Sequence, residues 1–366
     1  MVSEVRGHAT VAGTARYAAR AQGIPRSHFR DFRELTFSSL GVGTYLGNPD
    51  AETDRSVEEA LVRSVASGAV NLVDTAINYR HQKAERSVGR ALRRLIQENR
   101  ITRDEIFLCT KNGYLAPDGD APVPPAEWIR QELVATRSLD PKEIVDGAHA
   151  MSVSFLRDQL ARSLHNLGVE AVDLLYLHNA ADAQLEAVGR RVFMERLAAA
   201  FEFYEEARKK GRLLWYGLAT WDTFRLARTE PGYLSLQDVV EVARAAGGDA
   251  HGFAFIQFPF NLAMPEAAMI RNQPVRGQRV TLFEAAHLLH VGTFSSVPLM
   301  QGRLAQWSGA WPGWTGAQTA LQFARSAPHH LAPLVGQKGL DHVEENLKVA
   351  RSPPLDPEEF HSLLKK

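Results

Sequence analysis

The sequence is poor in features that would each point to a particular class of protein. It contains one cysteine, Cys109, so no intramolecular disulfide can form, and a reducing compartment suits the chain. Lysine plus arginine and aspartate plus glutamate both number 42, so no net field favours nucleic acid or an anionic membrane. No apolar run reaches the length of a membrane span, and residues 1–13 lack the apolar stretch of a secretory signal. We therefore expect a cytoplasmic protein without membrane or nucleic-acid partners.

The chain is rich in apolar β-type runs that alternate with amphipathic helical stretches, and 45% of its residues are hydrophobic. We expect strands at residues 39–44, 70–74, 106–110, 172–178, 213–219, 253–258, 292–297 and 331–336. Helices are expected at residues 54–67, 84–98, 154–167, 193–210, 282–290, 318–325 and 342–350. This rhythm predicts an α/β protein, a single-domain (βα)8 TIM barrel. A doubly wound open sheet is the alternative, which the lack of a GxGxxG turn disfavours.

Three segments interrupt the alternation. Residues 1–36 form an N-terminal extension with a short helix expected at residues 13–22. Within the barrel, residues 37–350, a long loop at 112–150 follows the third strand, and residues 264–280 separate the sixth strand from its helix. Residues 351–366 are expected to form a C-terminal tail or helix. Long loops at the C-terminal mouth of a barrel are usually lids or binding loops.

Polar side chains stand where several buried strands end. Asp74 and His178 each end a predicted strand, Lys111 directly follows another, and Tyr79 follows the second strand closely. In a barrel, such residues converge on one mouth, so the four predict a site for proton transfer. Each residue alone also has an ordinary structural interpretation: a helix cap, a core aromatic, a solvated charge or a hydrogen-bonded histidine.

Several motifs in a specific order carry a resemblance to a known family. They are Leu40-Gly41-Val42-Gly43-Thr44, residues 68–76 followed by Tyr79, Glu85 and Gly89, Thr110-Lys111, residues 163–167 leading into 172–178, Pro298-Leu299 with Gly302, and residues 344–347. By these motifs the chain resembles the aldo/keto reductase superfamily from about residue 37 to residue 350. The resemblance implies a NAD(P)-dependent oxidoreductase barrel.

The resemblance also implies a catalytic tetrad of Asp74, Tyr79, Lys111 and His178. Hydride delivery to a carbonyl carbon leaves an alkoxide unless a proton reaches the oxygen, and Tyr79 is expected to supply it. A free phenol is a weak acid with a pKa of about 10, and we expect Lys111 to lower the pKa of Tyr79. Asp74 would hold Lys111 by a charge-assisted hydrogen bond, and His178 would hold the substrate oxygen in line.

The cofactor that the resemblance implies is NADP, with NAD as the alternative. Its predicted binding residues are Thr44, Thr220, Gln257, Ser296, Pro298, Leu299, Gly302, Gly336, Gln337, Lys338, His342, Glu345 and Asn346. Lys338 is expected to meet the 2′-phosphate. The sequence departs from the family at the nicotinamide end, because Ala219 and Thr220 replace a Ser-Asn pair and Ser296 replaces a stacking aromatic residue.

The substrate is expected to be a small carbonyl compound or a sugar, with Trp128, His149 and Asn179 as candidate contacts and Trp307, Trp311 and Trp314 as further candidates for the pocket wall. An aldose 1-dehydrogenase that works in the oxidative direction is one alternative. A dinucleotide-binding sensor or partner-binding subunit is another, motivated by Ala219, Thr220 and Ser296. A metal-dependent hydrolase is disfavoured because residues 39–44 carry no metal ligand, and no metal is expected. The sequence indicates no oligomeric state.

Overall fold

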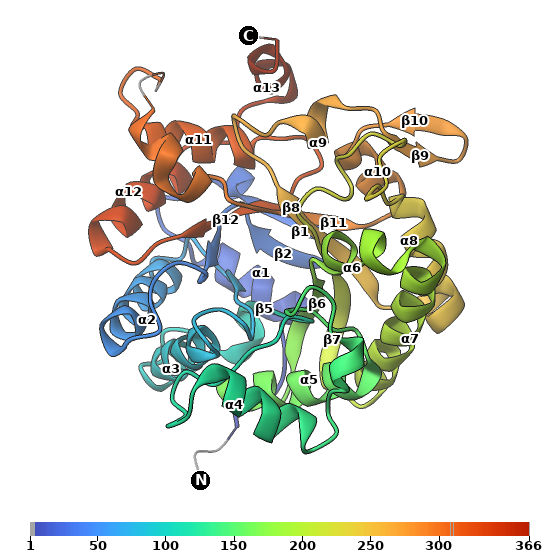
Figure 1. Cartoon of the computed structure of the whole chain (residues 1–366). Helices are drawn as coiled ribbons and strands as arrows, with labels where there is room; N and C mark the ends of the chain where they lie inside the picture. The colour runs from blue at the N-terminus through green and yellow to red at the C-terminus, as the bar shows by residue number, and fades with distance from the viewer. Residues whose placement is uncertain (1–3, 308, 310, 366) are drawn as a thin grey trace.

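A computed structural model describes residues 4–307, 309 and 311–365. Parallel strands form a closed barrel in the order β11-β12-β3-β4-β5-β6-β7-β8 (Figure 1). Their bounds are β3 Gly41–Gly43, β4 Leu72–Asp74, β5 Phe107–Asn112, β6 Val172–His178, β7 Leu213–Ala219, β8 Phe253–Pro259, β11 Gly292–Ser296 and β12 Ala332–Gly336. The predicted (βα)8 barrel is confirmed, and every predicted strand overlaps an observed one. All residues of β6 are buried, as expected of a strand with helices on one side and the barrel interior on the other.

Helices surround the barrel, as Figure 1 shows in a view close to the barrel axis. Seven helices overlap the seven predicted ones. They are α2 Ala51–Ala66, α3 Lys83–Gln97, α5 Val153–Leu167, α7 Arg190–Lys209, α10 Leu282–Leu288, α11 Gly316–Arg325 and α12 Leu340–Ala350. Local chemistry sets their ends: Asp50 caps α2 by accepting a hydrogen bond from the backbone N–H of Thr53. Helix α5 ends at Gly168, whose φ of 65° is the left-handed conformation that glycine adopts without strain.

An antiparallel hairpin in the N-terminal extension was not predicted. Strands β1 (Phe29–Phe32) and β2 (Leu35–Ser38) place Phe37 against Phe107 and Phe255, with ring centroids 4.9 and 6.0 Å apart. Phe107 begins β5, so the hairpin covers the end of the barrel where the strands start. The first helix, α1, spans Val11–Ala19 rather than the predicted residues 13–22. It begins earlier because Thr10 is its N-cap, and the Thr10 side chain accepts a hydrogen bond from the backbone N–H of Gly13.

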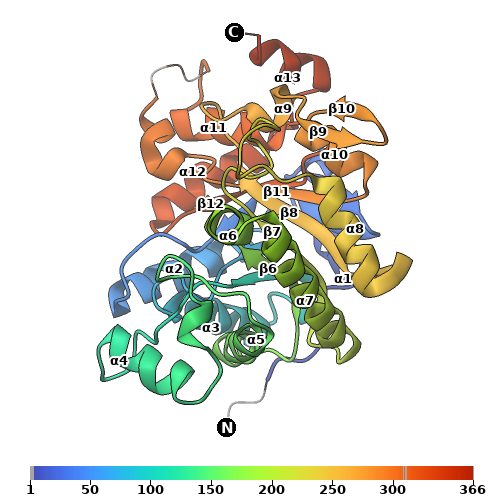
Figure 2. The same cartoon turned by 45° about the vertical axis from the view of Figure 1, so that its right-hand side comes forward.

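Several elements extend beyond the barrel (Figure 2). The loop after β5 contains α4 Pro125–Ile129 and the helical turns η3 Arg130–Val134 and η4 Pro141–Glu143. The remaining elements are η1 Arg26–His28, η2 Arg103–Glu105, α6 Ala180–Val188, α8 Leu236–Gly247, η5 Gly248–Ala250, α9 Glu266–Met269, β9 Gln273–Val275, β10 Gln278–Val280, η6 Met300–Gln306 and α13 Pro357–Leu363. In the described part of the chain, no helix has both the length and the apolar character needed to cross a membrane.

Candidate active site

A cavity of about 670 Å³ opens at the C-terminal ends of the barrel strands. Asp74, Tyr79, His178 and Asn179 border it at one end, and its walls run to Asn346 on α12. The predicted cofactor residues all border this one cavity: Thr44, Thr220, Gln257, Ser296, Pro298, Leu299, Gly302, Gly336, Gln337, Lys338, His342, Glu345 and Asn346. The structure thus brings together residues that lie up to about three hundred positions apart in the chain.

Lys111 and Asp74 form a buried ion pair behind the cavity wall. The Lys111 ammonium lies 2.5 Å from Oδ2 of Asp74 and donates a second hydrogen bond of 2.9 Å to the carbonyl of Thr75. The lysine side chain is fully buried, so the cavity itself is bordered by Asp74 and not by Lys111. Burial lowers the pKa of Lys111, but the interactions of the ammonium with Asp74 and Tyr79 together outweigh burial and leave that pKa above its ordinary value. Lys111 is therefore an ammonium at neutral pH.

Tyr79 stands over this ion pair, with the Lys111 Nζ 4.7 Å from its ring centroid. Its ring is partly exposed to the cavity and meets the ring of His178 at 5.7 Å between centroids. Burial raises the pKa of Tyr79 above its ordinary value, and Lys111 opposes this shift without reversing it. Lys111 thus acts on the pKa of Tyr79 in the direction expected from the sequence, but burial, which disfavours the phenolate, and the charge of Asp74 outweigh it, so the pKa is raised and not lowered. Tyr79 is therefore a neutral phenol at neutral pH.

His178 is held by two polar side chains. Its Nδ1 lies 3.2 Å from Oδ1 of Asn78, and its backbone carbonyl lies 2.8 Å from Nε2 of His149. Burial lowers the pKa of His178 well below its ordinary value, and the charge of Lys111 adds to this effect. The imidazole is therefore neutral at neutral pH. The amide of Asn78 decides its tautomer, since an amide oxygen accepts from Nδ1–H and an amide nitrogen donates to a bare Nδ1.

The far end of the cavity carries a buried amide network beside an exposed cation. Asn346 donates to the side chain of Gln337 at 2.7 Å, and Gln337 donates to the hydroxyl of Ser64 at 2.6 Å. Glu345 accepts a hydrogen bond from the hydroxyl of Thr315. Lys338 is exposed and immediately precedes Gly339, the residue before α12. These contacts make the amide pair rigid and leave the ammonium group of Lys338 at the cavity rim.

The middle of the cavity contains Ala219, Thr220 and Ser296, the positions at which the sequence departs from the family that it resembles. Gln257 donates to Oδ1 of Asp74 at 3.0 Å, so it is tied to the ion pair. Thr220 is buried and donates to the carbonyl of Gln257 at 3.4 Å. Ala219 and Ser296 border the same space. Trp221, which is 42% exposed, is the aromatic residue that borders the cavity beside Thr220.

Two predicted substrate contacts do not border the cavity. Trp128 lies in a separate apolar cluster of the long loop, with Leu133 and Leu139, and the Arg162 guanidinium lies 5.0 Å from its ring centroid. His149 is buried behind His178, where it binds backbone rather than open space. An indole or imidazole in a loop can serve the packing of that loop as well as a ligand, and the sequence does not distinguish these cases. Trp307, Trp311 and Trp314 are likewise not among the cavity-lining residues of the described chain.

Other residues on the cavity wall were not predicted from the sequence. They come from loops after three different strands and are Tyr45, Asn78 and Tyr114. Position directly after a strand is the signal that could have identified them, since Tyr45 lies two residues beyond β3 and Tyr114 two residues beyond β5. The described residues contain no group of three or more histidine, cysteine, aspartate or glutamate side chains that could hold a metal ion.

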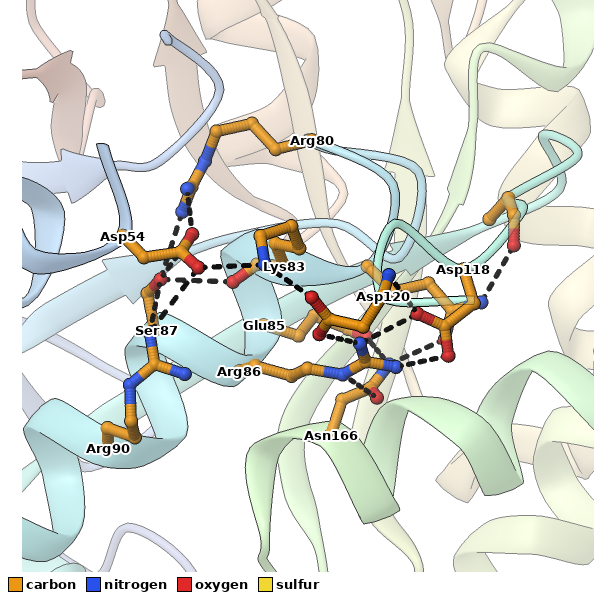
Figure 3. Close-up of polar contacts among 12 residues, drawn as sticks. Asp54, Arg80, Lys83, Glu85, Arg86, Ser87, Arg90, Asp118, Asp120 and Asn166 are labelled. Atoms are coloured by element: carbon orange, nitrogen blue, oxygen red, sulfur yellow. Dashed lines mark hydrogen bonds and ion pairs between the residues drawn. The ribbon is translucent and has the colours of Figure 1, made fainter. Parts of the chain in front are cut away.

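A network of ion pairs supports the segment that follows Tyr79 (Figure 3). Arg80 is paired with Asp54 at 2.5 Å, and Lys83 contacts both Asp54 at 3.1 Å and Asp120 at 2.6 Å. Arg86 binds Asp120 and forms a two-pronged contact with Asp118, so the long loop after β5 is fastened to α3. A second connection runs from the buried Glu85 to Thr110, the residue before Lys111, at 2.6 Å.

Comparison with known proteins agrees with this architecture. Residues 39–308 match the aldo/keto reductase family. The NADH-specific methylglyoxal reductase of Escherichia coli K12 is 25% identical over 149 residues, which are 40% of this chain and 39% of that protein. The match therefore spans about two fifths of the length of this curated relative.

Solved structures share the fold over almost the whole chain. The holo form of aldo-keto reductase AKR11C1 from Bacillus halodurans has a TM-score of 0.61 at 18% identity, covering 92% of this chain and 95% of that one. An aldo/keto reductase from Klebsiella pneumoniae in complex with NADP and acetate has a TM-score of 0.59 at 18% identity, covering 93% and 94%. The chain belongs to the aldo/keto reductase family, a class of NAD(P)-dependent oxidoreductases, which confirms the resemblance read from the sequence.

Proposed function

We propose that this protein is an NADPH-dependent reductase of small carbonyl compounds, in which Tyr79 is the general acid. The observation that carries the proposal is the placement of the Tyr79 ring above the Lys111–Asp74 ion pair and beside a neutral His178, all at one end of a cavity. Family membership and the methylglyoxal reductase named above support the reaction class.

The cavity fits a dinucleotide by the chemistry of its walls. Gln257, Thr220 and Ser296 would hold the nicotinamide end, Asn346 and Gln337 the adenine end, and Lys338 the 2′-phosphate, for which its ammonium is a suitable point charge. Two structures of similar fold, both of aldo/keto reductases from Klebsiella pneumoniae, are complexes with NADP or NADPH. When bound, the cofactor supplies the hydride. NADP is the proposed partner, and NAD remains the alternative.

The side chains of this protein supply the proton and orient the substrate. Tyr79, a neutral phenol, donates its proton to the carbonyl oxygen as negative charge develops there. Lys111 stabilises the phenolate that forms, and Asp74 holds Lys111 in place. His178 lies beside the substrate oxygen. With Oδ1 of Asn78 3.2 Å from Nδ1 and accepting its hydrogen, Nε2 of the neutral ring has no hydrogen to donate, so His178 would orient the oxygen as an Nε2–H donor only after the Asn78 amide turns to present its nitrogen to Nδ1. In the oxidative direction the phenolate of Tyr79 accepts the proton of the alcohol, which is the route an aldose 1-dehydrogenase would use.

The decisive experiment compares Tyr79→Phe with the wild-type protein. We expect turnover of short aldehydes to fall by about 10²–10⁴-fold, the usual contribution of general acid catalysis, while the Kd for NADPH stays within about threefold. Tyr233→Phe is the matched control, because it removes another tyrosine hydroxyl, which donates to the carbonyl of Asn272 at 2.9 Å outside the cavity. Unchanged turnover in Tyr79→Phe refutes the assigned mechanism.

The same measurements separate the proposed enzyme from a dinucleotide sensor. NADPH fluorescence reports binding, and its decay on addition of carbonyl compounds reports oxidation. Binding by the wild type without oxidation by aldehydes, ketones or aldoses would replace the enzyme by the sensor, which the Ala219, Thr220 and Ser296 departures favour. Reduction of NADP⁺ by free aldoses, faster than the reverse reaction, would instead select the aldose dehydrogenase.

A further inference from the structure

Two polar side chains beside His178 have hydrogen-bonding capacity to spare. Asn179 follows His178 directly, and Tyr114 lies two residues beyond β5, with its ring 5.1 Å from that of His178. Nδ2 of Asn179 donates to the hydroxyl oxygen of Tyr114 at 3.4 Å. Within the described residues, the hydroxyl hydrogen of Tyr114 and Oδ1 of Asn179 have no other partner, and both residues border the cavity.

Both side chains are held in place by their backbones and neighbours. Asn179 adopts a left-handed conformation with φ of 46°, and its N–H donates to the carbonyl of Ala219 at 2.6 Å. The carbonyl of Tyr114 accepts a hydrogen bond of 2.6 Å from Gln159, and the Tyr114 ring packs edge-on against His149 at 5.0 Å. The free donor and acceptor therefore have defined positions, which binding does not need to order.

The same end of the cavity lacks a group that would bind an anion. Among the described residues that line the cavity, the charged ones are Asp74, which is paired with Lys111, and Lys338 and Glu345 at the opposite, cofactor end. Two large aromatic side chains, Tyr45 and Trp221, are 57% and 42% exposed and border the cavity. The surroundings of Tyr79 thus combine apolar faces with neutral hydrogen-bonding groups.

We propose that Tyr114 and Asn179 form a hydroxyl-binding subsite, and that the preferred substrates are uncharged carbonyl compounds with a hydroxyl group on a neighbouring carbon. Small hydroxyaldehydes and aldoses belong to this class. An unsubstituted aldehyde leaves the Tyr114 and Asn179 groups without a partner, and a phosphorylated or carboxylated carbonyl compound loses solvation without gaining a cation. This inference rests on the proposed reductase function and adds the substrate class.

The test compares kcat/KM with NADPH for D-glyceraldehyde, propanal and glyceraldehyde 3-phosphate, each corrected for its free carbonyl fraction. We expect D-glyceraldehyde to exceed propanal by about 10–100-fold, the effect of two neutral hydrogen bonds, and the phosphate ester to be reduced least well. Tyr114→Phe and Asn179→Gly, which suits the left-handed backbone, should each lower the D-glyceraldehyde to propanal ratio by about 3–10-fold. Tyr233→Phe should leave the ratio unchanged.

The outcomes distinguish this inference from the function on which it rests. If propanal is reduced but D-glyceraldehyde is not preferred, or if neither variant changes the ratio, the subsite is refuted while the reductase stands. Efficient reduction of glyceraldehyde 3-phosphate refutes the uncharged class. If NADPH binds and none of the three compounds is reduced, the reductase itself fails and the inference fails with it.

Discussion

Replacing Asp54 by asparagine tests whether the ion-pair network behind Tyr79, the proposed general acid, holds that tyrosine in position. Asp54 lies in the first turn of α2, and its carboxylate contacts Arg80 at 2.5 Å and Lys83 at 3.1 Å (Figure 3). The side chains of Arg80 and Asp54 are only 1% and 10% exposed. Asparagine keeps the shape of aspartate but removes the charge, so the guanidinium of Arg80 would remain buried without its counter-ion.

We expect Asp54→Asn to lower the free energy of unfolding strongly, because the Asp54–Arg80 pair is buried and because the backbone after Tyr79 has an unfavourable conformation. Removing one partner of a buried ion pair typically costs about 3–5 kcal/mol. Arg80, His81 and Gln82 also have φ values of 49°, 54° and 70°, a left-handed run directly after Tyr79. Each such residue is disfavoured by roughly 1–2 kcal/mol, so contacts must hold the segment in place. We expect Asp54→Asn to lower the free energy of unfolding by about 3–5 kcal/mol.

Glu59→Gln is the matched control. Glu59 is also on α2 and pairs with Arg94 of α3 at 2.5 Å, the same distance as the Asp54–Arg80 pair, but the two side chains are 52% and 38% exposed. Exposed pairs contribute about 0–1 kcal/mol, because solvent screens the charges. Both substitutions therefore lie on α2 and remove an ion pair of equal length. They differ in burial and in the partner, because Arg80 precedes α3 whereas Arg94 lies on it.

Urea unfolding and steady-state kinetics provide the two measurements. If the network positions Tyr79, Asp54→Asn should lower kcat for short aldehydes by about 10–100-fold through a displacement on the order of 1 Å, with the Kd for NADPH within about threefold. The double variant Asp54→Leu/Arg80→Met should recover stability without recovering kcat, since an apolar pair restores burial but not backbone support. The reasoning is refuted if Asp54→Asn matches Glu59→Gln within about 1 kcal/mol and keeps full kcat.

Two further predictions concern the cofactor and acid stability. Lys338→Gln should weaken NADPH binding by about tenfold and leave NADH binding nearly unchanged, because only NADPH carries the 2′-phosphate. Lys348→Gln, at another exposed lysine, is the control. An equal loss of affinity for both cofactors would contradict a contact between Lys338 and the 2′-phosphate. Burial lowers the pKa of His149 to about 4, whereas the pKa of an unfolded histidine is about 6.5. As pH falls from about 6.5 towards 4, the unfolded chain binds a proton that the folded chain does not, so the free energy of unfolding decreases. Between about pH 7.5 and about pH 5, the wild type should lose about 2 kcal/mol more unfolding free energy than His149→Gln; parallel losses would contradict this.

Local sequence patterns were sufficient for the barrel and for the residues at the strand ends. A buried parallel strand is a short, largely apolar run, and Asp74, Lys111 and His178 lie at or directly after the predicted ends of such runs, so they could be placed without any tertiary contact. Strand bounds for β6 and β7 agree with the predicted residues 172–178 and 213–219. The position of the predicted cofactor residues around one cavity follows from barrel closure, because closure brings all C-terminal strand ends to one mouth.

The roles of residues in the loops could not be predicted from local sequence patterns in this way. Phe37 was not predicted to enter the barrel interior, and Trp128 was expected at the substrate although it fills the core of its own loop. An aromatic side chain has the same local pattern in either role, and only contacts with distant residues decide between them. The position of Tyr114 just beyond a strand could have indicated the cavity wall, but its contact with Asn179 could not be predicted locally, since that contact depends on the pairing of β5 with β6.

The sequence by itself determined the order of the eight barrel strands, the barrel and the identities of the acid, the phenol, the ammonium and the imidazole. Only the tertiary structure decided their electrostatic state. Lys111 was expected to lower the pKa of Tyr79, yet burial raises it, and the neutral His178 also follows from burial. A pKa depends on the solvent exclusion and charges around a group in three dimensions, and residues from many strands create that environment together.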